Sequence, residues 1–147
     1  STYTPEMVEC VKQLCLTADI ITPNLTELKI ISGEDDIISA GKKIMDKGVK
    51  SVIVTGVVED EKIANYVFSD GIMKKYTTDF VKSAAQEGSF SGTGDIFSSF
   101  VLGKILNGAS VFDAVEQAAG FISQAIKHSD IKNRNDGIDF EPFLKNI

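Results

Sequence analysis

The sequence predicts an α/β fold built around a mostly parallel sheet, and two observations lead to this class. Val49–Gly56 is rich in β-branched residues and nearly all apolar at its centre, which is typical of a strand buried on both faces in a parallel sheet. Segments whose apolar residues recur at helical spacing lie before and after it. This alternation of strands and helices along the chain indicates the α/β class.

The N-terminal part of the chain is predicted to contain three helices and one short strand. Thr4-Pro5-Glu6 combines an N-cap residue, a proline at the first helical position and an acid in the first turn, so a helix begins there. Ala18–Thr22 is a short apolar run that ends at Pro23, and it predicts a strand because proline keeps the residue before it extended. The two helices predicted to follow, each closed by a glycine, span 24–31 and 34–47.

The C-terminal part is predicted to contain a hairpin and two longer helices. Ser69-Asp70-Gly71 is a turn signal, which predicts antiparallel strands over 63–68 and 72–78 at a sheet edge. Ile96–Asn107 is apolar over more than half of its circumference, so we expect a buried helix. Ser110–Asp113 carries the S-x-x-D signature of another helix start.

The composition limits the classes of function. A chain of 147 residues with 43% apolar residues suits one domain, residues 1–147, with a real core. Its 15 basic and 21 acidic residues give a net charge of −6, and no basic run is present to neutralise nucleic-acid phosphates. No apolar stretch reaches the roughly 20 residues of a membrane span. We therefore expect a cytoplasmic protein that binds neither nucleic acid nor membrane.

The cysteines and the histidine do not form a reactive cluster. Cys10 and Cys15 lie on a predicted helix and point about 140° apart, which suits neither a metal site nor a local disulfide, so we expect them to be reduced. His128 lies near a helix end, where a cation suits the helix dipole, and a surface role is expected. P-loop and dinucleotide-binding fingerprints are absent from the sequence.

The segment Ser91–Asp95 is the leading candidate for a functional site. Two glycines and an acid precede the apolar run of a predicted helix, and a helix start offers unpaired N–H groups that suit a phosphate. Asp95 would repel a phosphate, so it needs a separate reason to be there, and proton abstraction is the obvious one. The alternative is that Asp95 is an ordinary first-turn acid favoured by the helix dipole.

Two further motifs each admit a structural and a functional interpretation. Asn24-Leu25-Thr26-Glu27 matches a capping box, and the functional alternative is that Glu27 reaches a Mg²⁺ carried by a nucleotide, directly or through water. Thr55-Gly56 ends the most buried predicted strand, where it could be a turn or could let a ligand approach closely.

Taken together, three segments resemble the ribokinase-like superfamily and, within it, the pyridoxal/pyridoxamine kinase group. They are Ile21–Leu28, Val54–Gly56 and Gly92–Asp95, in this order and spacing. The resemblance implies a three-layer fold with helices on both faces of a mostly parallel sheet. It also implies that residues 1–147 form the C-terminal, ATP-binding half of a vitamin kinase.

The resemblance implies a role for each motif. Asp95 would be the base that takes the proton from the hydroxymethyl group of a B6 vitamer, and the amides of Gly92, Thr93 and Gly94 would form the anion hole for the transferred phosphoryl group. Asn24 and Glu27 would hold the Mg²⁺ region. The residues implied to approach ATP are Thr55, Gly56, Phe80 and Val81.

The resemblance also implies partners and leaves alternatives open. ATP and a small vitamin are the implied substrates, Mg²⁺ the cofactor with room for a monovalent cation such as K⁺, and a homodimer the form of the complete enzyme. Hydroxymethylpyrimidine kinases often carry cysteine where Asp95 stands, and sugar kinases usually differ where Thr93 stands, so a B6-vitamer kinase is favoured over both. Because the N-terminal half of the family fold is missing, the chain by itself is predicted to be inactive, or to be a non-catalytic nucleotide-binding or association module.

Overall fold

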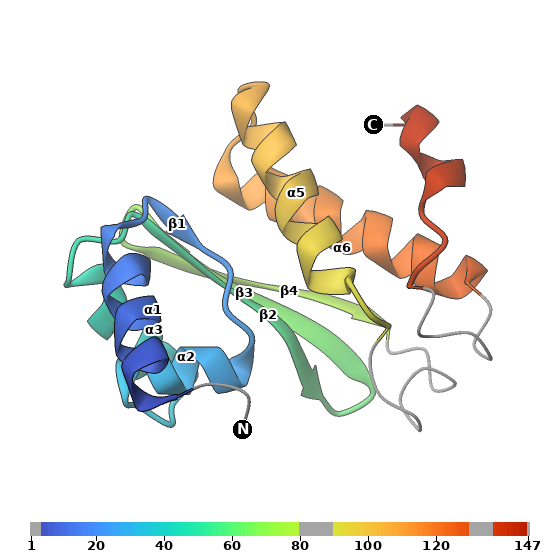
Figure 1. Ribbon diagram of the computed structural model, residues 1–147. Helices are drawn as coiled ribbons and strands as arrows, with labels where there is room; N and C mark the ends of the chain where they lie inside the picture. Colours follow the sequence, from blue (N-terminus) through green and yellow to red (C-terminus); the bar gives the residue numbers. More distant parts are fainter. Residues whose placement is uncertain (1–3, 80–89, 130–136, 147) are drawn as a thin grey trace. The chain divides into compact units, whose positions relative to one another are not determined.

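The computed structural model describes residues 4–79, 90–129 and 137–146. Figure 1 shows the helices and strands, coloured in chain order. The elements are α1 (Pro5–Thr17), β1 (Ile20–Ile21), α2 (Leu25–Ser32), α3 (Ile37–Met45), β2 (Ser51–Glu59), β3 (Lys62–Ser69), β4 (Ile72–Asp79), α5 (Thr93–Leu106), α6 (Val111–His128) and the 3-10 helix η2 (Glu141–Asn146).

The chain divides into two compact units. Unit 1 comprises residues 1–57 and 65–75, and unit 2 comprises residues 58–64 and 76–147. Strands β2, β3 and β4 contribute residues to both units, because each boundary falls within a strand. This division does not test the expectation of a single domain over residues 1–147, which stays a prediction.

The described strands form one mixed sheet. Its strand order is β1-β2-β3-β4, and β1 pairs with β2 in parallel, with Ile20 opposite Ser51 and Ile21 opposite Val52. Strands β2, β3 and β4 follow one another through two-residue turns, a connection that joins antiparallel neighbours. The α/β class and the predicted hairpin are confirmed, and the parallel pairing within the described residues is that of β1 with β2.

Local side-chain capping fixes where most helices begin. Thr4 caps α1 by accepting a hydrogen bond from the Met7 amide at 3.3 Å, and Ser110 caps α6 by accepting one from the Asp113 amide at 3.1 Å. Helix α3 begins later than predicted, at Ile37, because the Asp36 carboxylate accepts from the Ser39 amide at 2.8 Å and caps the helix there.

Unit 1 has its core where the sequence predicts a doubly buried strand. Residues Val52, Ile53 and Val54 of β2 are fully buried, which confirms that both faces of this strand are covered. The largest fully buried side chains that helices α2 and α3 contribute are Leu28 and Ile44.

Gly41 of α3 lies against the ring of Phe68, and its replacement by alanine should destabilise unit 1. A Cβ at Gly41 would meet Phe68 ring carbons at 2.6 Å, so the ring must move in a packed core. Overpacking of this kind costs about 1–3 kcal/mol, measurable as a lower midpoint of urea unfolding. The matched control is Gly103→Ala, a helical glycine whose Cβ would meet nothing within 4 Å. Equal stability of the two variants would contradict the packing.

Unit 2 is organised by the packing of α5 against α6. The expectation that α5 is a buried helix is wrong: Phe97 and Val101 are its buried residues, whereas Leu102 is 54% and Leu106 77% exposed. The apolar residues of α5 face all sides of the helix, so packing against α6 covers one stripe and leaves the others in solvent.

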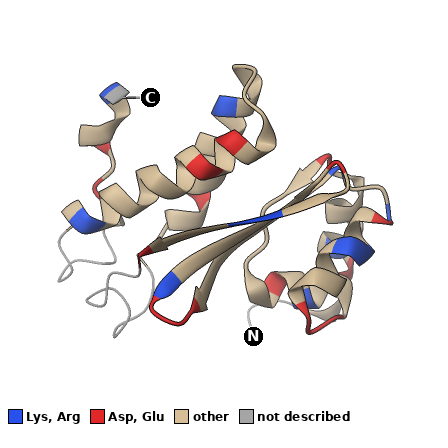
Figure 2. Cartoon of the chain, turned by 180° about the vertical axis from the view of Figure 1, so that it is seen from behind, with Lys and Arg blue, Asp and Glu red and all other residues tan. Residues whose placement is uncertain are grey.

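Charged residues occur on many of the described elements. Figure 2 shows the acidic and basic segments spread over many elements. Among the described helices, none combines the length and the apolarity needed to cross a bilayer.

Candidate active site

The first turn of α5 leaves its backbone amides free of side-chain caps. Gly92 is the N-cap residue, with φ 75° and ψ −1°, and no side chain of the described residues caps this end of the helix. A positive φ of this size favours glycine, so the local sequence explains the turn. The Thr93 hydroxyl donates a hydrogen bond to the Phe90 carbonyl at 2.9 Å, which fixes the orientation of the Thr93 side chain. The helix start can therefore accept an anion on its N–H groups.

The space beside this turn is open. Among the described residues, a Cβ added at Gly92 or at Gly94 would meet nothing within 4 Å. Gly94 is also helical and has no positive φ, so neither packing nor backbone conformation within the described residues requires a glycine there. Because glycine weakens a helix relative to alanine, its presence at Gly94 calls for another reason, such as close approach of a ligand.

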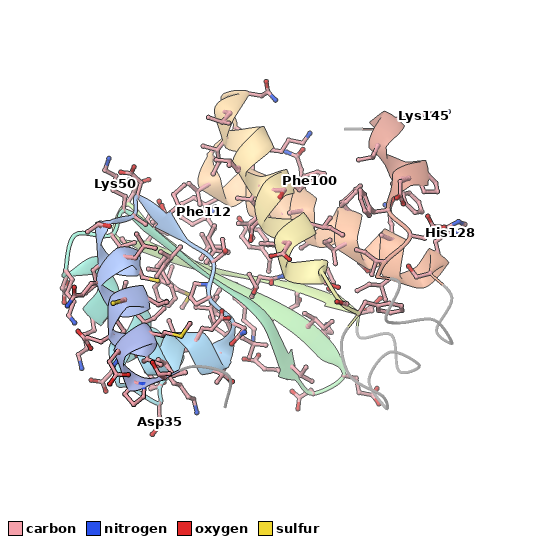
Figure 3. All side chains as sticks on the ribbon, in the orientation of Figure 1. Asp35, Lys50, Phe100, Phe112, His128 and Lys145 are labelled. Carbon is pink, nitrogen blue, oxygen red and sulfur yellow. The ribbon has the colours of Figure 1, made fainter. Side chains whose placement is uncertain are left out.

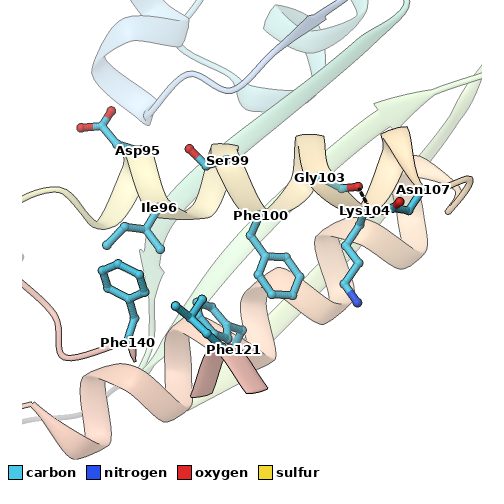
Figure 4. A pocket seen from close by; sticks show the side chains of 10 residues that line it. Asp95, Ile96, Ser99, Phe100, Gly103, Lys104, Asn107, Phe121 and Phe140 are labelled. Atoms are coloured by element: carbon cyan, nitrogen blue, oxygen red, sulfur yellow. Dashed lines mark hydrogen bonds between the residues drawn. The ribbon is translucent and has the colours of Figure 1, made fainter. Parts of the chain in front are cut away.

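Asp95 lies in the same turn with its carboxylate uncommitted. The residue is exposed, and within the described part of the chain its side chain makes no hydrogen bond or ion pair. Figure 4 shows the carboxylate directed away from the Phe100 and Lys104 side chains, which extend toward α6. An unpaired carboxylate beside open helix amides is free to accept a proton from a bound hydroxyl group.

A groove of about 690 Å³ runs along α5 within unit 2. Aromatic rings dominate it: the Phe100 and Phe121 centroids are 4.8 Å apart, and Lys104 Nζ lies 5.4 Å from the Phe100 centroid. Phe140, from the segment that leads into η2, also lines the groove (Figure 4). Asp95 stands at the N-terminal end of its α5 wall, so the groove adjoins the candidate anion site.

Asn24 and Glu27 form the capping box that the sequence predicts as one alternative. Glu27 donates its amide to Asn24 Oδ1 at 2.9 Å, and Asn24 donates its amide to Glu27 Oε2 at 2.9 Å. Both side chains are exposed, and a carboxylate has about four acceptor positions, so Glu27 keeps capacity for a cation. No group of three or more His, Cys, Asp or Glu residues among the described ones could hold a metal. This donor set fits a Mg²⁺ that takes its other ligands from phosphates and water.

Thr55 is next to this capping box. Asn24 and Thr55 form an isolated parallel bridge, and the Thr55 amide donates to the Pro23 carbonyl at 3.0 Å. Unit 1 therefore brings Asn24, Glu27 and Thr55 to one end of the parallel strand pair, where α/β proteins bind ligands.

Gly56 does not end the strand, which corrects the predicted boundary. β2 continues to Glu59 although Gly56 has φ 68°. The side chain of Asn65, which is 5% exposed, accepts a hydrogen bond from the Gly56 amide at 3.2 Å. This bond satisfies the Gly56 amide at the position where the positive φ interrupts the regular strand conformation. The sequence motifs did not point to Asn65 as a functional or structural residue, although a lone asparagine inside the apolar run 63–68 is a detectable signal.

The charge of Glu27, a member of the capping box, acts on the Cys15 thiol. Burial raises the pKa of the Cys15 thiol, and the negative charge of Glu27 raises it further, so the thiol stays protonated at neutral pH. Cys10 and Cys15 are both free cysteines, and their reduced state stays a prediction. His128 is 55% exposed at the C-terminus of α6, in line with its expected surface position.

The predicted site residues thus fall into two groups. Asn24, Glu27, Thr55 and Gly56 belong to unit 1, whereas Gly92–Asp95 belongs to unit 2. The predicted ATP contacts Phe80 and Val81 lie outside the described residues.

The sequence matches known vitamin kinases. Residues 1–138 match the family model of phosphomethylpyrimidine kinase. The chain is 34% identical over 135 residues to a pyridoxine kinase of Bacillus subtilis, covering 85% of this chain and 48% of that protein. It is 32% identical over 116 residues to a hydroxymethylpyrimidine/phosphomethylpyrimidine kinase of Aquifex aeolicus, covering 76% of this chain and 44% of that protein.

The fold agrees with the sequence matches. The ADP complex of Bacillus subtilis pyridoxal kinase matches with a TM-score of 0.80 and 28% identity, covering 97% of this chain and 57% of that chain. The chain therefore spans about half the length of the relatives it matches. On this sequence match and this fold, it belongs to the phosphomethylpyrimidine kinase family, within the ribokinase-like superfamily that its motifs resemble.

Proposed function

We propose that this chain carries the nucleotide-binding and proton-accepting part of a B6-vitamer kinase. The enzyme transfers the γ-phosphoryl group of ATP to the hydroxymethyl oxygen of pyridoxal, pyridoxamine or pyridoxine. The observation that carries the proposal is the start of α5, where, within the described residues, uncapped amides and two open glycine positions lie beside an Asp95 carboxylate without a partner. The ADP bound by the Bacillus subtilis relative supports a nucleotide as the ligand.

The chemistry follows from these groups. The hydroxymethyl oxygen forms a bond to the γ-phosphorus while the bond from that phosphorus to the ADP oxygen breaks, and the hydroxyl proton passes to the Asp95 carboxylate. The amides of Gly92, Thr93 and Gly94 hold the phosphoryl oxygens as charge develops on them. Asn24 and Glu27 are proposed to hold Mg²⁺, which neutralises phosphate charge when bound, and Thr55 and Gly56 to approach the phosphates.

Hydroxymethylpyrimidine is the second candidate substrate. The Aquifex aeolicus relative has nearly the same identity to this chain as the pyridoxine kinase does, 32% against 34%. Both vitamins present a hydroxymethyl group on an aromatic ring, so the proposed site could accept either. Asp95 and Thr93 favour the B6 vitamers through the resemblance described above.

Two assays test the proposal. The first measures Mg·ATP binding to the 147-residue chain by calorimetry, where we expect binding without turnover because about half of the relatives' fold is not matched. The second measures ADP release by the longest natural polypeptide that contains this chain, with a panel of pyridoxal, pyridoxamine, pyridoxine, hydroxymethylpyrimidine and ribose.

The outcomes separate the alternatives. Turnover with a B6 vitamer supports the proposal, turnover with hydroxymethylpyrimidine alone selects the second candidate, and turnover with ribose alone indicates a sugar kinase. Nucleotide binding without phosphorylation of any compound in the longest polypeptide would indicate a non-catalytic module. If neither the 147-residue chain nor the longest polypeptide binds Mg·ATP, the proposed function and each of these alternatives are wrong.

A further inference from the structure

We propose that residues 137–146, called here the C-terminal segment, position the Ser91–Asp95 loop for phosphoryl transfer. Gly137 is the positioning residue, because the absence of a side chain there lets the segment pass close to the Ser91 carbonyl. The catalytic consequence rests on the proposed function, whereas the mechanical coupling between the segment and the loop does not.

Gly137 lies close to the backbone of Ser91, with no room for a side chain between them. Gly137 has φ +87°, and a Cβ added to it would lie 3.3 Å from the Ser91 carbonyl oxygen, which is tighter than ordinary van der Waals contact. Ser91 directly precedes Gly92, the N-cap residue of α5. The next residue of the segment, Ile138, is 5% exposed, so its buried side chain anchors the backbone at this point. A side chain at position 137 would therefore press on the loop that presents the anion-binding amides.

The residues that follow Gly137 are bonded to the C-terminal end of α6. Ser129 is buried, accepts a hydrogen bond from the Asp139 amide at 2.8 Å, and donates its hydroxyl to the Ala125 carbonyl at 2.7 Å. His128 Nε2 lies 3.4 Å from Asp139 Oδ2, and the His128 ring meets the Phe143 ring edge-on at 5.6 Å. Figure 3 labels His128 at the end of α6, from which these contacts reach the segment. The segment is thus tied to a rigid helix while it touches the loop.

The segment also shares the groove with Asp95. Phe140 and Leu144 line the same groove as Asp95, so the segment flanks the proposed site at a second point. Within the loop itself, the Thr93 hydroxyl donates a hydrogen bond to the Phe90 carbonyl at 2.9 Å. Gly137 lies close to the Ser91 carbonyl, where an added Cβ would crowd it. Because donors for a transferring phosphoryl group act only when well placed, small shifts of this loop should lower the rate.

The first test compares Gly137→Ala with Gly108→Ala. Both glycines have similar positive φ, +87° and +92°, so alanine strains the backbone equally, but a Cβ at Gly108 would meet nothing within 4 Å. In ¹⁵N–¹H spectra of the 147-residue chain, we expect the Gly92, Thr93 and Gly94 amides to shift in G137A and to stay in place in G108A. In the longest natural polypeptide, kcat should fall roughly three- to tenfold in G137A with an unchanged KM for the vitamin.

A second pair of variants loosens the segment without pressing on the loop. Ser129→Ala removes the acceptor of the Asp139 amide, and Ser32→Ala is its matched control. Ser32 is likewise buried at a helix end, donates to the Leu28 carbonyl at 2.8 Å and accepts from the Glu34 amide at 3.0 Å, but lies in unit 1. We expect faster exchange of the Ile96 amide, which donates to the Gly92 carbonyl at 3.0 Å, in S129A than in S32A.

The amide measurements decide the coupling independently of any activity. If the Gly92–Gly94 amide shifts respond no more to G137A than to G108A, and Ile96 amide exchange responds no more to S129A than to S32A, the coupling is absent and the inference falls. If they respond while the wild-type polypeptide phosphorylates nothing, the proposed function fails but the mechanical link stands. A fall in kcat of G137A that G108A matches would show a general loss of stability and would also overturn the positioning role.

Discussion

Replacing Asp95 with asparagine should lower kcat by roughly 10²–10⁴-fold, the range expected when a proton-accepting group is removed. Asparagine keeps the shape of the side chain but cannot take the proton of the substrate hydroxyl. The KM for ATP should change little, because the backbone amides of the first turn of α5 stay in place. Steady-state kinetics in the longest natural polypeptide, with ATP and the vitamin varied separately, measures both quantities.

A matched control separates chemistry from helix stability. Asp113 occupies the same third position of α6 that Asp95 occupies in α5, and its carboxylate accepts from the Ser110 hydroxyl at 2.7 Å. Asp113→Asn therefore removes a first-turn charge and weakens a cap, at a typical cost of about 0.3–1 kcal/mol, without touching the proposed site. Near-normal turnover of D95N, or an equal loss in D113N, would contradict the role of Asp95 as base.

Replacing Gly94 with alanine should change stability and turnover in opposite directions. Gly94 is helical and its Cβ would meet nothing, so alanine should stabilise the fold by roughly 0.5 kcal/mol through helix propensity. The same methyl group would stand beside the amides proposed to hold the phosphoryl group. Turnover should fall on the order of 10²-fold, comparable to the loss of one donor to a developing anion.

Urea unfolding and kinetics on the same preparation measure the two effects of G94A. Gly120→Ala is the control, since this glycine is also helical, in α6, and its Cβ would meet nothing within 4 Å. G120A should gain stability and keep its turnover. If G94A also keeps full turnover, no ligand approaches this face of the turn, and the anion hole lies elsewhere.

Most local structure could be predicted because it depends on neighbouring residues. The caps at Thr4, Asn24 and Ser110 bond to amides three residues away, so spacing alone predicts them. The turn at Asp70-Gly71, where both residues have positive φ, likewise follows from its own two residues.

The features that could not be predicted depend on distant partners. Whether β2 stops at Gly56 depends on Asn65, nine residues away on the neighbouring strand, whose side chain satisfies the Gly56 amide. How much of α5 is buried depends on how much surface α6 offers, which a helix with apolar residues on all sides does not reveal. The link from Gly137 to the Ser91 carbonyl spans a long stretch of chain, and the sequence shows only a glycine in a polar tail.

The sequence by itself determined the α/β class, the capped helix starts at Pro5, Leu25 and Val111, the family and the candidate residues from Asn24 to Asp95, because hydrogen-bonding motifs and hydrophobic periods are local properties of a chain. Only the tertiary structure decided that Asn24 bridges to Thr55, that Gly94 has no structural need to be a glycine, and that Asp95 has no partner within the described residues. The physical reason is that open space and unpaired charge are defined by what surrounds a residue, and those surroundings come from segments remote in the sequence.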